Sequence, residues 1–245
     1  MTRTKLGLLG LCAVVLGMMA MSASSAQASL FAWLYLVTEG GTAVEVGGTE
    51  KIQVEGETDS TDLTLLTHII NRAIAITCTN FTVTGVNLEK EGTLTSGGKV
   101  KFTGCEAYGN GALGEPLGCN VKTSGQPVGT IESNAGKGAL LLHEISAGVT
   151  ELVTKIEPVT GTVFATILTS KCVLPESNTI NGKLFIKDCQ SMAELHLKKH
   201  LIVQNSLTSL WIGADTVEHL ETSIDGSAWA FLTSGQAWGG KHNLP

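Results

Sequence analysis

The chain has 245 residues, of which 43% are hydrophobic and 16% are charged, so it is long enough to bury a sizeable apolar core without metal ions. Its 16 basic and 22 acidic residues give a formal net charge of −6. A nucleic-acid partner would require clustered lysines and arginines that replace the counterions of the phosphates, and this acidic balance argues against one.

The first 28 residues have the pattern of a secretory signal peptide. Arg3 and Lys5 precede an uncharged apolar run over residues 6–21, and a small, polar segment then ends in Ala26-Gln27-Ala28. This order is typical of the basic, apolar and A-x-A cleavage regions of a secreted precursor. The alternative is a retained membrane anchor, although a full span needs about twenty apolar residues. We predict a signal peptide over 1–28.

Cleavage after Ala28 would leave a single secreted all-β domain over 29–245. The leader holds two basic residues and no acidic one, so the mature chain keeps 14 basic and 22 acidic residues, a net charge of −8. No later apolar run reaches spanning length, because 30–37 is short and 63–78 contains polar and charged residues. We therefore expect no membrane span after cleavage, and a secreted, extracellular or cell-wall-associated protein.

Short runs rich in Val, Ile, Thr and Leu, separated by Gly, Asn, Asp and Ser, extend from residue 30 to the end. Their spacing of about eight to twelve residues predicts an all-β fold, an antiparallel β-sandwich or barrel-like sheet, with a β-solenoid as the alternative. The predicted strands downstream of residue 120 lie at 121–123, 129–132, 139–143, 151–156, 162–168, 183–187, 193–204, 207–212, 217–222 and 227–232.

Residues 61–76 also fit one short helix. Their apolar residues recur with a period near 3.6: Leu63, Leu66, Ile69, Ile70, Ala73 and Ile74. Asp59, Ser60 or Thr61 could cap such a helix. The β-branched residues at 64, 67, 69 and 70 equally allow a buried strand, so both interpretations stay open.

Turns are predicted at four sites where Gly follows Ser, Asn or Asp. Ser96-Gly97-Gly98 is expected to join residues 92–95 and 99–103 in a tight hairpin. Further turns are expected at Asn110-Gly111, Asn181-Gly182 and Asp225-Gly226.

Five cysteines follow the leader: Cys78, Cys105, Cys119, Cys172 and Cys189. In an oxidising compartment this odd number predicts two disulfides and one thiol. A zinc site would need close pairs such as C-x-x-C, and the sequence has none. We expect a Cys105–Cys119 bond, because the loop between these residues is rich in glycine and short, together with Cys78–Cys172 and a free Cys189. The strongest alternative is Cys78–Cys105 with Cys172–Cys189.

Short motifs surround these cysteines: Cys78-Thr79, Phe102-Thr103-Gly104-Cys105, Leu117-Gly118-Cys119, Gly129-Thr130-Ile131 and Lys171-Cys172, followed by a strand region over 226–240. Over most of the mature chain this pattern resembles a family of secreted, β-rich, cysteine-containing proteins of unassigned activity that occurs as several paralogues in soil actinobacteria. The resemblance implies secretion, a β-rich fold and cysteines at Cys78, Cys105, Cys119 and Cys172. Cys189 would be additional, and no chemistry is implied.

His196 and His200 have the i, i+4 spacing of a helical metal site. The parity of the flanking leucines indicates a strand instead, which would hold the imidazoles about 13 Å apart. Lys198 and Lys199 would also repel a cation. We expect these histidines to be dispensable, and we predict no metal and no cofactor.

No catalytic residues are predicted. The chain has no G-x-S-x-G motif, and His68, His143 and His219 have no local nucleophile signature. Five acidic residues are interpreted simply as solvated charges: Glu144, Glu151, Asp188, Glu218 and Glu221. The alternative function is a secreted hydrolase whose site assembles only in space.

Two aromatic pairs share a strand parity, Trp33 with Tyr35 and Trp229 with Phe231. Such pairs usually belong to a core, although they can also stack sugars. The sequence predicts a secreted or cell-envelope-associated, non-catalytic structural or binding module. Its partner would be a cell-wall or extracellular polysaccharide or a protein.

Overall fold

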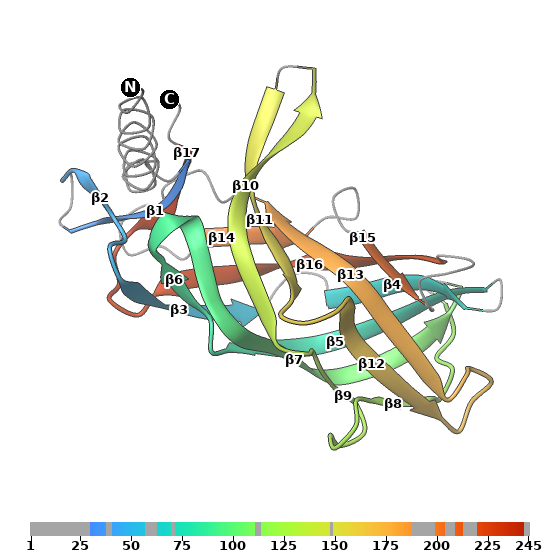
Figure 1. Ribbon diagram of the computed structural model, residues 1–245. Helices are drawn as coiled ribbons and strands as arrows, with labels where there is room; N and C mark the ends of the chain where they lie inside the picture. Colours follow the sequence, from blue (N-terminus) through green and yellow to red (C-terminus); the bar gives the residue numbers. More distant parts are fainter. Residues whose placement is uncertain are drawn as a thin grey trace, which may run out of the picture.

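The computed structural model describes residues 30–37, 41–56, 63–69, 72–110, 114–147, 149–187, 199–203, 209–212 and 220–242 (Figure 1). The signal-peptide prediction, His196, His219, Asp188, Glu218 and Cys189 lie outside these residues.

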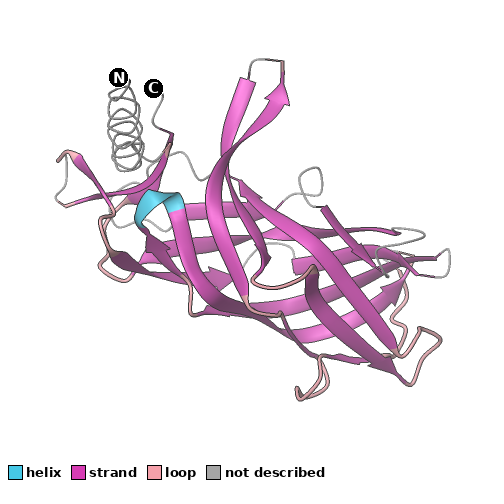
Figure 2. Ribbon diagram, viewed as in Figure 1, coloured by secondary structure: helices cyan, strands magenta, loops and turns pink. Residues whose placement is uncertain are grey.

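Almost all of the described chain is β-strand, as Figure 2 shows. The strands are β1 (Phe31–Leu36), β2 (Ala43–Glu45), β3 (Thr49–Gly56), β4 (Leu63–Ile69), β5 (Arg72–Thr84), β6 (Asn87–Glu89), β7 (Thr93–Gly109), β8 (Asn120–Lys122), β9 (Thr130–Glu132), β10 (Gly136–Ser146), β11 (Val149–Pro158), β12 (Val163–Ser170), β13 (Ser177–Lys187), β14 (Lys199–Val203), β15 (Ser209–Ile212), β16 (Leu220–Leu232) and β17 (Trp238–His242). A short 3-10 helix, η1 (Lys90–Gly92), precedes β7.

The large sheet closes on itself. Its strand order is β10-β11-β13-β12-β8-β9-β7-β6-β3-β5-β4-β16-β14, and the two ends of this path pair again with inner strands, β10 with β7 and β14 with β13. Almost every pairing is antiparallel, the one-residue contact of β8 with β9 being parallel. The predicted all-β, barrel-like fold is therefore confirmed.

A smaller sheet of order β17-β1-β2 lies at one end of the molecule (Figure 1). In it, β1 pairs with β17 over five residues, so strands from the two ends of the described chain lie side by side. Its buried residues Trp33 and Trp238 pack against the interior of the large sheet. The small sheet thus covers one end of that interior.

The helix considered over 61–76 does not form. Described residues of this segment belong to β4 and β5, which pair with each other from Leu63↔Cys78 to Ile69↔Arg72. β4 also pairs with β16. In the described residues this segment therefore forms paired strands, and long-range hydrogen bonds decide between the two interpretations.

Three predicted turns are wrong. Ser96-Gly97-Gly98 lies inside β7, Asn181-Gly182 inside β13 and Asp225-Gly226 inside β16. Gly97 and Gly182 adopt φ values of 102° and 110°, which other residues rarely adopt. These glycines bend a continuous strand, as closure of a sheet requires, and do not reverse the chain.

Most of the buried apolar residues belong to two clusters. The disulfide cluster consists of Ile74, Ile76, Cys78, Cys105, Ala107, Val121, Ile131, Phe164, Ala165, Ile167, Leu174, Ile180, Leu184 and Ile224. The tryptophan cluster consists of Trp33, Val46, Leu88, Leu140, Leu152, Ala230, Leu232 and Trp238.

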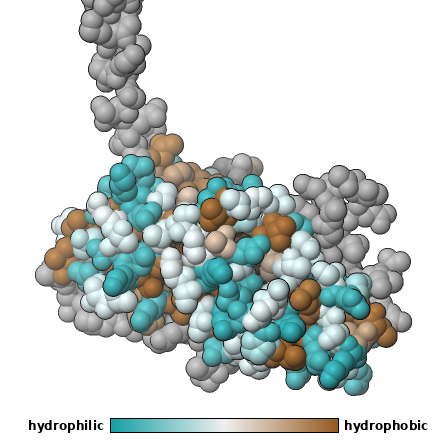
Figure 3. Space-filling view, turned by 60° about the horizontal axis from the view of Figure 1, so that its bottom comes forward, coloured by the Kyte–Doolittle hydropathy of each residue, from teal (hydrophilic) through white to brown (hydrophobic). Residues whose placement is uncertain are grey.

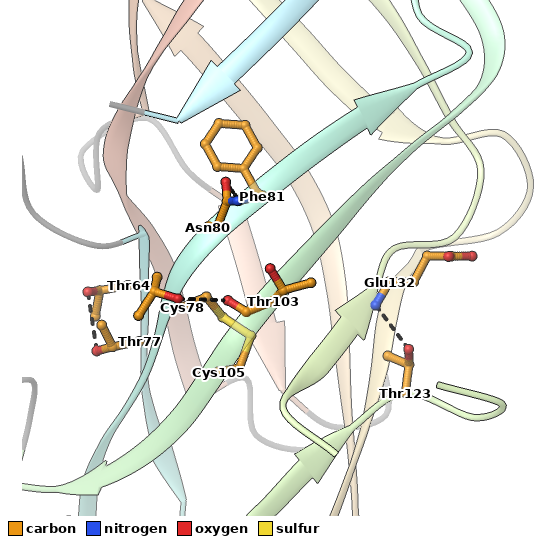
Figure 4. Close-up of a disulfide and its surroundings, with 10 residues drawn as sticks. Thr64, Thr77, Cys78, Asn80, Phe81, Thr103, Cys105, Thr123 and Glu132 are labelled. Carbon is orange, nitrogen blue, oxygen red and sulfur yellow. Dashed lines mark hydrogen bonds between the residues drawn. A yellow bond between two sulfur atoms is a disulfide. The ribbon is translucent and has the colours of Figure 1, made fainter. Parts of the chain in front are cut away.

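The four cysteines that we predicted to be bonded do form disulfides, but the predicted pairs, Cys105–Cys119 and Cys78–Cys172, are wrong. The bonds are Cys78–Cys105 and Cys119–Cys172. Cys78 lies directly opposite Cys105 where β5 pairs with β7 (Figure 4). The second bond joins the segments beside β8 and β12, which pair at Asn120↔Ser170. Strand register therefore determines the pairing, and half of the alternative scheme is correct.

Candidate ligand-binding cavity

An apolar cavity of about 150 Å³ lies between the two buried clusters. Phe164, Leu184 and Ile224 of the disulfide cluster contribute to its wall, as do Leu88 and both tryptophans of the tryptophan cluster. The cavity thus belongs to the interior of the closed sheet and is covered at one end by the small sheet.

Alternate residues of neighbouring strands build the wall. Successive side chains of a strand point to opposite faces, so residues two apart share the inner face. Examples are Ile52 and Val54 on β3, Phe81 and Val83 on β5, and Val100 and Phe102 on β7. Polar and apolar residues alternate over 99–103, and this alternation is the local sequence signal of the wall.

The polar groups of the wall are already engaged. The Nε1 group of Trp33 donates a hydrogen bond of 2.8 Å to the carbonyl oxygen of Thr93, and that of Trp238 donates one of 3.4 Å to Ala230. Thr154 is buried and takes part in an interaction within the fold. The cavity therefore offers an almost purely apolar surface.

Lys99 is the charged residue among those that line the cavity, and it is exposed. Its Nζ lies 2.9 Å from Oε1 of Glu132, whose other oxygen accepts a hydrogen bond of 3.1 Å from Gln126. Next to Lys99, a side chain at Gly98 would overlap Val86. At this bend of β7 the cavity lining includes an exposed residue, so the cavity lies near the surface there. The positive charge of this lysine is balanced by the carboxylate of Glu132.

One face of the outer surface is seen in Figure 3. Hydrophobic residues there are scattered in small groups among hydrophilic ones. The apolar groups that could hold a ligand therefore lie in the interior and not on this face.

The aromatic pairs considered in the sequence differ in position. Trp33 is 2% exposed and Tyr35 packs against the same cluster, so the core interpretation is correct for this pair. Trp229 and Phe231 are half-buried and lie on the face of β16 opposite to the buried Ala230. The sequence alone could not separate the two cases, because strand parity does not say which face is covered.

Of the titratable residues considered in the sequence analysis, those that the structure describes do not line the cavity. His143 of β10 lies opposite Glu151 of β11, and Glu151 forms an ion pair with Lys187 at 3.8 Å. His200 belongs to β14, opposite Trp229. His68, Glu144 and Glu221 belong to β4, β10 and β16. Within the part of the chain that the structure describes, no group of three or more His, Cys, Asp or Glu residues could hold a metal ion.

A charged cluster lies on β10, β11 and β13, where Glu157 is within 3.9 Å of three lysines. The distances from its carboxylate are 3.1 Å to Lys155, 3.7 Å to Lys137 and 3.9 Å to Lys183. Burial raises the pKa of Glu157, but the hydrogen bond from Lys155 and the charges of all three lysines together lower it below its ordinary value of 4.5.

Replacing Glu157 by glutamine should lower the stability at pH 7 by about 1 kcal/mol or less, as is usual for ion pairs near the surface. Because folding lowers the pKa, the charged carboxylate stabilises the fold above pH 4.5, and this contribution disappears as the pH falls through the folded-state pKa. Denaturation of both proteins between pH 3 and 7 measures the effect. The difference in stability between the parent protein and the variant should disappear in acid. Glu176→Gln, at an exposed position, serves as the control. A gap of constant size at all pH values would contradict the electrostatic explanation.

Among the described residues, no helix is long and apolar enough to cross a membrane. No family model, curated protein or solved structure matches the chain.

Proposed function

We propose that this chain is a secreted, non-catalytic binding protein that holds a small apolar ligand inside its closed sheet. The observation that carries this proposal is the apolar cavity of about 150 Å³. A dry cavity of about this size in another protein binds benzene or xenon. Ligand sites in closed β-sheets are commonly interior, because the inward-facing residues alternate along every strand.

Secretion is supported by two independent features. The leader over 1–28 has the order of regions found in signal peptides. The two disulfides are consistent with an extracellular location, because disulfides persist in oxidising compartments.

The absence of catalytic groups from the wall favours binding over hydrolysis. Among the residues that the structure describes, those that line the cavity include no histidine, carboxylate or serine. Nucleophilic hydrolysis requires a nucleophile, a base and an orienting group within hydrogen-bond reach of one another. The cavity can therefore hold a molecule, but its lining supplies no group that would cleave one.

Thermal unfolding with and without benzene tests the proposal. A ligand that binds only the folded state raises the midpoint, and a tenfold excess over Kd contributes about 1.4 kcal/mol. Two variants should reduce this rise by narrowing the cavity: Ala228→Leu on β16, and Val83→Leu, which adds a single methylene on β5. Ala147→Leu, at an exposed turn, is the matched control and should retain the rise.

The result that would overturn the proposal is an unchanged midpoint of the parent protein with benzene, cyclohexane and xenon. If benzene still raises the midpoint of both narrowed variants, it does not bind in this cavity, and the proposal is also overturned.

A further inference from the structure

We infer that the cavity selects an uncharged, compact hydrocarbon group and rejects a carboxylate of the same size. This inference rests on the proposed function and concerns the chemical class of the ligand. It follows from three features: the volume of the cavity, the engaged polar groups of its wall, and the ion pair beside it.

The volume limits the ligand to about the size of one six-membered ring. The cavity measures about 150 Å³, which is well below the roughly 300–1,000 Å³ of sites for larger organic ligands. A single ring, or a short branched chain, matches this space. A longer molecule could place only one apolar end inside.

The described residues of the wall offer few polar groups to a ligand, and these already take part in interactions within the fold. The donors of Trp33 and Trp238 are bound to backbone carbonyl oxygens, and Thr154 is engaged within the fold. A hydroxyl or amide of the ligand would lose its hydrogen bonds to water without replacement, which weakens binding by about tenfold or more. A buried carboxylate would lose much more.

Lys99 does not change this result. Lys99 is exposed, and its ammonium group lies 2.9 Å from the carboxylate of Glu132. An anionic group that approached Lys99 would also meet the negative charge of Glu132. The pair therefore gives no net attraction for a carboxylate head group beside the cavity.

A series of ligands with one shape and different polarity tests this inference. Toluene, benzyl alcohol and benzoate carry the same ring, and their Kd values can be measured by titration calorimetry at pH 7. We expect toluene to bind, benzyl alcohol to bind about tenfold or more weakly, and benzoate to bind more than about a hundredfold more weakly. Cyclohexane should bind like toluene.

Variants of the ion pair give a second readout. Glu132→Gln leaves Lys99 without its partner carboxylate and should leave toluene binding unchanged, because Glu132 does not line the cavity. Lys99→Met changes the lining itself, and in this variant benzoate should still bind more than about a hundredfold more weakly than toluene. Benzoate that binds the parent protein as tightly as toluene, or whose binding depends on Lys99, would overturn the inference while leaving the proposed function intact. If none of the ligands binds, toluene included, the proposed function itself is wrong.

Discussion

Replacing Cys119 and Cys172 together by alanine is expected to lower the free energy of unfolding by about 4 kcal/mol. Their bond closes a loop with a sequence separation of 53 residues, and in the chain-entropy model a loop of this length restricts the unfolded chain by about that amount. This is a large part of the roughly 5–15 kcal/mol that stabilises an ordinary domain. Denaturant unfolding of the parent and the double variant measures the difference.

Peptide mapping without reducing agent provides the control for this experiment. The parent protein should yield one peptide pair linking Cys78 to Cys105 and another linking Cys119 to Cys172. A stability loss below about 1 kcal/mol, or a peptide pair that links Cys105 to Cys119, would contradict the expected result.

Replacing Trp33 by alanine should lower the free energy of unfolding by about 3–5 kcal/mol. The side chain is 2% exposed, and its ring centroid lies 5.7 Å from that of Trp238. Its loss would also leave the carbonyl oxygen of Thr93 without the indole donor. Chemical denaturation monitored by circular dichroism measures the change.

Two further variants separate the causes of this loss. Trp33→Phe keeps a ring but removes the indole donor, so its cost should lie between zero and that of alanine, at about 1–3 kcal/mol. Val44→Ala, on the neighbouring strand β2 and 42% exposed, should stay within about 0.5 kcal/mol of the parent protein. An equally small effect for Trp33→Ala would show that the small sheet does not stabilise the fold.

The sequence by itself determined the fold class and the position of many strands. Predicted strands at 121–123, 129–132, 139–143 and 151–156 coincide with or lie largely within β8, β9, β10 and β11. These predictions were possible because alternation of polar and apolar residues is a local property with a period of two. The sequence also predicted that Cys78, Cys105, Cys119 and Cys172 take part in disulfides, and they do.

Only the tertiary structure decided the pairing of these cysteines and the course of the glycine-rich segments. Cys78 bonds to Cys105 because β5 and β7 pair in a register that sets them opposite each other. That register depends on residues far apart in the chain. Gly97 could equally have served a hairpin or a bent strand, and the closure of the sheet selected the bend.

The cavity depended most strongly on the tertiary structure. Its wall combines residues from Trp33 to Trp238, which lie near opposite ends of the described chain. Each of these residues looks like an ordinary core residue in the sequence, because apolar alternation predicts an inner face and not how completely that face is filled. The empty volume is the difference between the space enclosed by the closed sheet and the volume of the inward side chains, and strand pairing around the whole sheet sets that space.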